Sequence, residues 1–256
     1  MQKENVLVIG FSGKKYSGKN TSALIALEYL YEYSVSICAN ISFQQIAYAN
    51  ALKKWVSLIS GLPIQDFTTE EGKAKKNPGN VVSLEKIDQD SFVTILMKIG
   101  EKSILKFKEL YYKTAVLLTD TNLTLGQLLQ IVGTDIFRET FSKEIWIQFV
   151  QATIFPNCNP TKFDPSKQID RIVFITDVRF ENEADWIKEL YGYVIRIERK
   201  DRGVIDQRNS SHPSETSLDN YMRFDSIIHN NGTLKKFKIV IQKLMENVVS
   251  EQKRIK

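Results

Sequence analysis

Residues 6–31 read VLVIGFSGKKYSGKNTSALIALEYLY, and this stretch decides the fold. Its first part, residues 6–9, is an apolar run bounded by Gly10, which predicts a short buried strand. A turn rich in glycine and lysine follows. Residues 21–31 then place apolar side chains three and four positions apart, which predicts a helix. A strand, a loop and a helix in this order are typical of the first unit of an α/β fold.

The turn itself carries a chemical pattern. Residues 13–19 (GKKYSGK), here named the glycine–lysine loop, match G-x-x-x-x-G-K. Glycines let the backbone turn tightly and aim successive N–H groups at phosphate oxygens, while the helix N-terminus and a lysine add positive charge. The pattern therefore predicts a nucleotide phosphate site that uses Gly13, Lys14, Ser17, Gly18 and Lys19. A plain helix N-cap with a glycine turn is the structural alternative.

The position after the loop departs from the usual pattern. It holds Asn20, where a Ser or Thr hydroxyl usually ligates Mg²⁺, and Thr21 comes one step later. An amide is a poorer magnesium ligand than a hydroxyl. We therefore expect an ion held mainly by phosphates and waters, with Asn20 as a candidate ligand.

A second polar cluster follows the clearest central strand, IVFI at residues 172–175. In open α/β sheets, ligands bind beyond the carboxyl ends of the strands, which is where Asp177 and Arg179 fall. A carboxylate there can hold a magnesium-bound water or accept a proton, and a guanidinium can grip a phosphate with two hydrogen bonds. The alternative is a local Asp–Arg pair that caps the next helix.

The rest of the chain repeats the alternation of strands and helices. Short strands are expected at residues 35–38, 193–197 and 227–228. Helices are expected at residues 43–59, 124–139, 143–154, 181–190 and 233–249. This order predicts one α/β domain over residues 1–256, with a mostly parallel sheet covered on both faces.

Composition narrows the class of protein. The chain has 256 residues, 43% of them hydrophobic, and a formal net charge of +5. No apolar run approaches the roughly 20 residues that span a bilayer, and we expect no membrane association and no secretory signal. Cys38 and Cys158 lie far apart, so we expect free thiols in a cytoplasmic protein. The positive charge suits phosphate substrates or nucleic acid, but no basic run is interleaved with aromatic residues, and we expect no stable nucleic-acid partner.

Five motifs in this order resemble the bacteriophage deoxynucleoside monophosphate kinases. They are IGFSGKKYSGKNT (9–21), LLQIVGTDIFRE (128–139) with Trp146 after it, ITDVRFENEAD (175–185), HPSETSLDN (212–220) and IIHNNGTLKKF (227–237). A looser match covers residues 43–63, whereas residues 81–120 and 156–168 look like insertions. The resemblance implies a P-loop kinase fold with a central, mostly parallel sheet flanked by helices. It also implies an inserted helical monophosphate-binding region at residues 40–154 and a lid at residues 199–217.

The resemblance further implies an activity and residue roles. Family members transfer the γ-phosphoryl group of ATP, with Mg²⁺, to a deoxynucleoside 5′-monophosphate, which serves dNTP supply for DNA synthesis. Carried over by position, the ATP site comprises residues 13–21 of the loop region together with Asn231 and Gly232. The catalytic residues would be Lys19, Asp177, Arg179 and Arg199, and the metal ligands Asn20 and Asp177. The monophosphate would contact Lys53, Arg138, Trp146, Arg179 and Glu183. The ring of Trp146 could stack on the base, but an aromatic residue at helical spacing more often belongs to the core.

The polar stretch before His212 fits a lid that closes over phosphates. Its arginines would supply mobile cations; they are Arg196, Arg199, Arg202 and Arg208. His212, with Ser214 and Glu215, is interpreted as a structural cluster at the base of that lid. Two other functions stay open: a P-loop kinase for another phosphorylated metabolite, and a basic ATP- and nucleic-acid-binding protein without kinase activity. The sequence also leaves base specificity and oligomeric state open, a homodimer included; for a viral protein the compartment would be the host cytoplasm.

Overall fold

The computed structural model describes residues 4–87, 104–140, 142–156, 159–200 and 212–253. The chain divides into two compact units. Unit 1 comprises residues 1–47 and 151–256, and unit 2 comprises residues 48–150. Each unit is described by itself.

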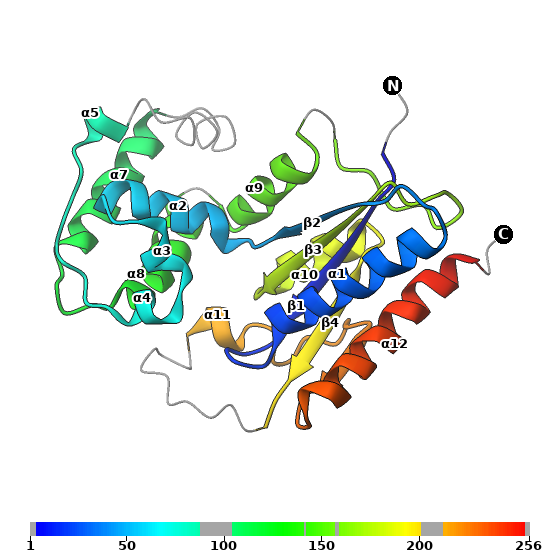
Figure 1. Ribbon diagram of the computed structural model, residues 1–256. Coiled ribbons are helices and arrows are strands. Elements are labelled where there is room, and N and C mark those ends of the chain that lie inside the picture. Colours follow the sequence, from blue (N-terminus) through cyan, green and yellow to red (C-terminus); the bar gives the residue numbers. More distant parts are fainter. Residues whose placement is uncertain (1–3, 88–103, 141, 157–158, 201–211, 254–256) are drawn as a thin grey trace. The chain divides into compact units, whose positions relative to one another are not determined.

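Unit 1 is built on a five-stranded sheet in which every pair of neighbouring strands is parallel. The strand order is β2-β3-β1-β4-β5. The strands are β1 (Val6–Ser12), β2 (Ser42–Ile46), β3 (Arg171–Val178), β4 (Tyr193–Glu198) and β5 (Ser226–His229). Figure 1 shows β1, β3 and β4 side by side in the sheet. The predicted fold class, an α/β P-loop kinase fold with a central parallel sheet flanked by helices, is confirmed.

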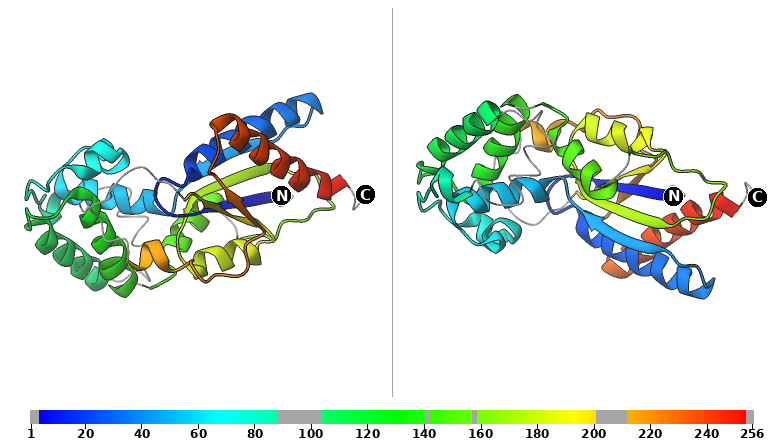
Figure 2. Two further views of the ribbon diagram at one scale, coloured as in Figure 1. Left: turned by 90° about the horizontal axis from the view of Figure 1, so that it is seen from below. Right: turned by 90° about the horizontal axis from the view of Figure 1, so that it is seen from above.

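Helices cover both faces of this sheet. On one face lie α1 (Lys19–Ser36) and α12 (Leu234–Lys253), which pack against each other, and α10 (Glu181–Glu189) lies on the opposite face (Figure 2). A single turn, α11 (Pro213–Thr216), precedes β5. Among the helices in the described residues, none combines the length and the apolar character needed to cross a membrane.

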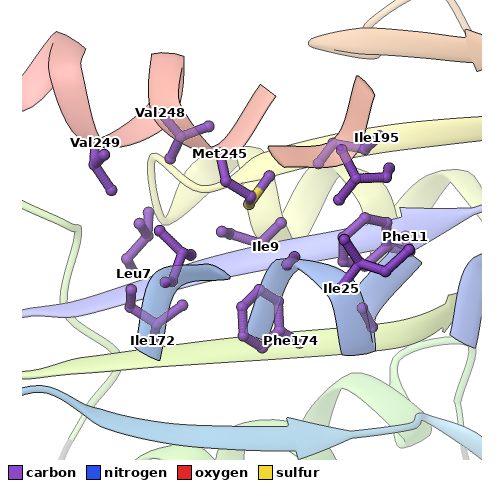
Figure 3. Packing of buried hydrophobic residues seen from close by; sticks show 14 of the residues in the cluster. Leu7, Ile9, Phe11, Ile25, Ile172, Phe174, Ile195, Met245, Val248 and Val249 are labelled. Atoms are coloured by element: carbon purple, nitrogen blue, oxygen red, sulfur yellow. The ribbon is translucent and has the colours of Figure 1, made fainter. Parts of the chain in front are cut away.

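The core of unit 1 forms where β1 meets the helices. All seven residues of β1 are buried, because the middle strand of a parallel sheet is covered on both faces. Ile9 of β1 faces Met245 of α12 in Figure 3, and both side chains are fully buried. Burying such side chains stabilises the fold by about 1.5–3 kcal/mol each. This packing fixes the carboxyl end of β1, from which the glycine–lysine loop departs.

Unit 2 is built from helices. They are α2 (Ala49–Ser60), α3 (Ile64–Thr68), α4 (Glu70–Ala74), α5 (Leu84–Ile87), α7 (Ile104–Leu118), α8 (Leu125–Ile131), the π-helix η1 (Val132–Arg138) and most of α9 (Ile145–Ile154). Trp55 lies at the centre of this unit, fully buried. Its ring packs edge-on against Phe107 and Phe137, and its indole N–H donates to Oγ1 of Thr114 at 3.1 Å.

Two expected elements were wrong. The strand predicted at residues 35–38 is absent because α1 continues to Ser36, and Val35 and Ile37 are exposed. The helix predicted over residues 43–59 begins only at Ala49, because residues 42–46 form β2 and pair with β3. The helix expected at residues 124–139 exists but changes into the π-helix η1 at Val132. The other predicted strands and helices are confirmed, with small shifts at their ends.

Candidate functional site

The glycine–lysine loop takes a backbone path that only glycine allows at two positions. Gly13 and Gly18 have φ values of 145° and 105°. A Cβ atom on Gly13 would lie 2.3 Å from the carbonyl oxygen of Ile197, and one on Gly18 would lie 2.6 Å from Nδ2 of Asn230. Both distances are far below van der Waals contact. The loop therefore turns tightly against β4 and the end of β5, as the pattern predicts.

Lys19 is the first residue of α1, and its ammonium group folds back over the loop. Nζ donates to the carbonyl oxygens of Gly13 at 2.5 Å and Lys14 at 2.8 Å. Burial and the positive charge of Arg179 lower the pKa of Lys19 from 10.5 to about 7, against the opposite pull of Glu215 and Asp177. The residue is only half-buried. A cation held in this way is placed to meet an anion at the loop.

Ser17 supplies a second polar group in the loop. Its side chain is 1% exposed, and Oγ has no hydrogen-bond partner within the described residues. Its carbonyl oxygen accepts a hydrogen bond from Nδ2 of Asn230 at 2.9 Å. A buried hydroxyl without a partner costs about 1–3 kcal/mol, so such a group calls for an explanation. A phosphate oxygen would satisfy it, and the loop, the hydroxyl and the ammonium together fit the phosphates of a nucleotide.

Arg179 follows β3 directly, and the structure gives its guanidinium a different partner from Asp177. Nη1 of Arg179 forms an ion pair with Oε1 of Glu215 and also donates to the carbonyl oxygen of Ser214 at 3.2 Å. Burial disfavours the charged arginine, but Glu215 and Asp177 outweigh this and raise its pKa further. Glu215 belongs to α11, so this ion pair joins the end of β3 to a segment that is distant in the sequence.

Glu183 has another role than the substrate contact that the resemblance implied. Its side chain is 2% exposed. Oε2 accepts hydrogen bonds from the backbone N–H groups of Arg179 at 2.8 Å and Phe180 at 3.1 Å. The carboxylate is therefore buried beneath the turn between β3 and α10 and fixes the backbone of Arg179.

Arg196 also differs from its expected role as a mobile lid cation. It lies within β4 and is 7% exposed. Nη1 donates to Oγ of Ser12 at 3.2 Å, and Nη2 pairs with Asp219 at 3.0 Å. The other oxygen of Asp219 accepts from Nζ of Lys14 at 2.7 Å. Arg196 is thus a fixed strand residue that, through Asp219, anchors the first lysine of the loop.

The remaining lid residues are only partly described. Arg199 is exposed immediately after β4. Residues 201–211, with Arg202 and Arg208, lie outside the described residues. His212 forms the N-cap of α11, where its Nδ1 accepts the backbone N–H of Ser214 at 3.2 Å.

The predicted adenine contacts lie on the turn after β5. Asn231 and Gly232 are exposed there, and Oδ1 of Asn231 accepts the backbone N–H of Lys200 at 2.8 Å. Asn230, which belongs to the same turn, contacts the loop directly through Ser17. Adenine binding at this turn stays a prediction.

The residues expected to hold a monophosphate belong to unit 2, apart from Arg179 and Glu183. Lys53 on α2 and Arg138 at the end of η1 are half-buried. Trp146 is 5% exposed, its ring stacks on Phe137 with centroids 4.7 Å apart, and its indole N–H donates to the carbonyl oxygen of Gly133 at 3.1 Å. The ring is therefore part of the core of unit 2, which is the commoner role of such an aromatic residue, and stacking on a nucleobase stays a prediction.

The two candidate metal ligands lie on separate elements. Asn20 is exposed on the first turn of α1 with Thr21, and Asp177 is half-buried near the end of β3. Over the part of the chain that the structure describes, no three His, Cys, Asp or Glu residues gather into a metal site. Magnesium commonly binds through one or two carboxylates together with phosphates and waters. Asp177 fits that mode, and both ligand assignments stay predictions.

Comparison with known proteins gives one family and two relatives. A family model described as deoxynucleotide monophosphate kinase matches residues 79–241. A protein assigned as a deoxynucleotide monophosphate kinase in Acanthamoeba polyphaga mimivirus is 33% identical over 127 residues, which are 47% of this chain and 61% of that protein. The deoxynucleoside-5′-monophosphate kinase of Escherichia phage T5 is 24% identical over 233 residues, which are 83% of this chain and 85% of that protein.

Proposed function

The chain belongs to the deoxynucleotide monophosphate kinase family, and on that premise we propose that it transfers the γ-phosphoryl group of Mg-ATP to a deoxynucleoside 5′-monophosphate. The products would be ADP and the deoxynucleoside diphosphate, in support of dNTP supply for DNA synthesis. The observation that carries the proposal is the grouping of a tight loop, Lys19 and Arg179 in one unit, at the carboxyl ends of parallel strands. This is the edge at which open parallel sheets bind ligands.

ATP phosphates would occupy the glycine–lysine loop. The loop supplies backbone N–H groups at the start of α1, where the helix dipole adds attraction for an anion. Lys19 would exchange its two carbonyl partners for phosphate oxygens, and Ser17 would donate its buried hydroxyl. These groups neutralise charge that otherwise opposes the approach of a second anionic substrate.

Arg179 would act on the transferring phosphoryl group and on the acceptor. Phosphoryl transfer needs little covalent help, because its main demands are alignment of the reactants and neutralisation of their charge. The side chain of Arg179 comes from the residue after β3, and it is charged at any physiological pH. A guanidinium at such a position can contribute about 10³-fold or more in rate.

Mg²⁺, when bound with the nucleotide, would neutralise charge on the phosphate oxygens. Asp177, and less directly Asn20, would be the side chains of this chain that face it, either as ligands or through bound water. Their donor types fit this role, since carboxylate and amide oxygens are hard ligands.

Within residues 40–154, the helices of unit 2 would form the monophosphate-binding region, with Lys53 and Arg138 as phosphate contacts. Residues 42–46 of that range belong to the sheet of unit 1 as β2. Residues 199–217 would form a lid that excludes water, with Arg199 as a catalytic cation. Both segments would belong to a single kinase domain over residues 1–256. The positive net charge supports small phosphorylated substrates.

The proposal is tested by measuring ADP release from Mg-ATP with each deoxynucleoside and ribonucleoside monophosphate in turn. We expect release that depends on at least one deoxynucleoside monophosphate. Release that depends only on another phosphorylated metabolite would place the chain among kinases with a different acceptor. Tight, salt-dependent DNA binding without any ADP release would favour an ATP- and nucleic-acid-binding protein instead.

A further inference from the structure

The carboxylate of Glu215 lies between Arg179 and the glycine–lysine loop. It pairs with Nη1 of Arg179, and the backbone N–H of Lys15 in the loop donates a hydrogen bond to it. The carbonyl oxygen of Ser214 accepts from the same nitrogen of Arg179 at 3.2 Å. One short turn of helix, α11, therefore contacts both the loop and the arginine.

This contact is partly shielded from solvent. The side chain of Glu215 is 15% exposed and that of Arg179 is 33% exposed. Burial would raise the pKa of the Glu215 carboxyl, but Arg179 and Lys19 hold it below its ordinary value, so the carboxylate is charged. A charge-assisted hydrogen bond in such surroundings is stronger and more directional than an exposed one.

Arg179 is thereby held at two points. Its backbone N–H is bound by the buried carboxylate of Glu183 at 2.8 Å, and its guanidinium by α11. Within the described residues, every hydrogen bond of the guanidinium uses Nη1. The Nε and Nη2 donors make none there. A guanidinium can bind a phosphate through two of its donors in a fixed fork.

We infer that Glu215 is a positioning residue that turns the guanidinium of Arg179 so that its remaining donors face the phosphate handled at the loop. This inference rests on the proposed function, because it names how one residue of that site is oriented. It separates two features of Arg179: Glu183 sets the place of its backbone, and Glu215 sets the direction of its side chain. Without Glu215, a long side chain regains rotamer freedom and loses its alignment.

The test is a double-mutant cycle with the variants Glu215→Gln, Arg179→Ala and the pair. Glutamine keeps the size of the side chain and an acceptor for the Lys15 N–H but removes the charge. We expect Glu215→Gln to lower kcat/KM for the monophosphate about tenfold, with the Kd for ATP within about threefold of the wild type. In the Arg179→Ala background, the same change should cost less than about twofold, because its effect passes through the arginine. Glu215→Asp retains the charge on a shorter side chain, so its kcat/KM should lie between those of the wild type and Glu215→Gln.

Asp225→Asn is the matched control. Asp225 also joins a cation, Lys188, to a backbone N–H, that of Val194 at 2.7 Å, but at the amino end of β4. We expect this variant to lose a similar amount of stability and to keep wild-type kcat/KM. Full and additive losses for Glu215→Gln and Arg179→Ala would overturn the inference, as would an equal kinetic loss in Asp225→Asn.

The same cycle is run on the Kd of deoxynucleoside monophosphates in the presence of a non-hydrolysable ATP analogue. If the effects of Glu215→Gln and Arg179→Ala on the monophosphate Kd are non-additive but the wild type shows no turnover, the proposed function is refuted and the positioning role is supported. If the wild type turns over and the effects of the two substitutions on the Kd are additive, only the positioning role is refuted. No binding of any deoxynucleoside monophosphate would refute both.

Discussion

Nδ2 of Asn230 donates a hydrogen bond to the carbonyl oxygen of Ser17 over 2.9 Å, joining the turn after β5 to the glycine–lysine loop. The two residues are 213 positions apart. The glycine–lysine loop, near the N-terminus, is thus held in place by a side chain from the C-terminal part of the sequence.

Replacing Asn230 with alanine should loosen this loop. The lost hydrogen bond is worth about 0.5–1.5 kcal/mol, so we expect the Kd for ATP to rise about fivefold in calorimetric titrations. His229→Ala serves as the control, because His229 is exposed and its side chain contacts Glu198. An unchanged Kd in Asn230→Ala would show that the loop keeps its shape without this bond.

Lys19→Ala should lose most turnover while the protein remains folded. The side chain is half-buried and its hydrogen bonds go to loop carbonyls, so removal affects the phosphate site more than the core. We expect kcat to fall about 100-fold or more, with a melting temperature close to that of the wild type. Activity at the wild-type level would refute the assignment of the loop.

Gly18→Ala should destabilise the protein. The residue has φ of 105°, and the added Cβ would meet Nδ2 of Asn230 at 2.6 Å. We expect the free energy of unfolding to fall by about 1–3 kcal/mol in urea titrations. Gly232→Ala is the stability control, since the nearest atom to its added Cβ is 3.6 Å away. Equal effects at the two glycines would contradict the strain argument.

The pair of Arg179 and Glu215 predicts a pH-dependent contribution to stability. Folding lowers the pKa of Glu215 from 4.5. The pair therefore stabilises fully above the unfolded-state pKa, and this contribution is lost as the pH falls through the lower pKa of the folded state. The wild type should exceed Glu215→Gln by about 1–2 kcal/mol in free energy of unfolding at pH 7, and the difference should shrink below pH ~4.5. A difference that is constant down to pH ~3 would contradict this.

The sequence predicted those parts of the site that depend on local pattern. The loop from Gly13 to Lys19 and the position of Arg179 after β3 follow from short motifs and strand ends. The strands β1, β3, β4 and β5 were also predictable. Strand β2 was not, because its short apolar pattern runs into the helical pattern of α2. Local pattern predicts these features because each segment's own residues indicate a strand, a turn or a helix, although the strands then pair over long distances in the sequence.

The missed features depend on contacts between distant segments. Glu215 binds Arg179 from 36 positions away, and Ser12 accepts from Arg196 over 184 positions. Such pairs leave no periodic trace in the sequence. Glu215 could be seen in the motif HPSE at residues 212–215, but the sequence did not show that its partner is Arg179. The role of Trp146 could not be decided from the sequence for a related reason: a tryptophan gives the same pattern whether its ring contacts a base or, as here, the ring of Phe137.

The central claim is that this chain phosphorylates deoxynucleoside monophosphates at the glycine–lysine loop. The most direct measurement is ADP release from Mg-ATP by the wild type and Lys19→Ala, across all deoxynucleoside and ribonucleoside monophosphates. The account predicts release that requires a deoxynucleoside monophosphate and is almost abolished in Lys19→Ala. Absence of release with every deoxynucleoside monophosphate, or equal release by the two proteins, would contradict it.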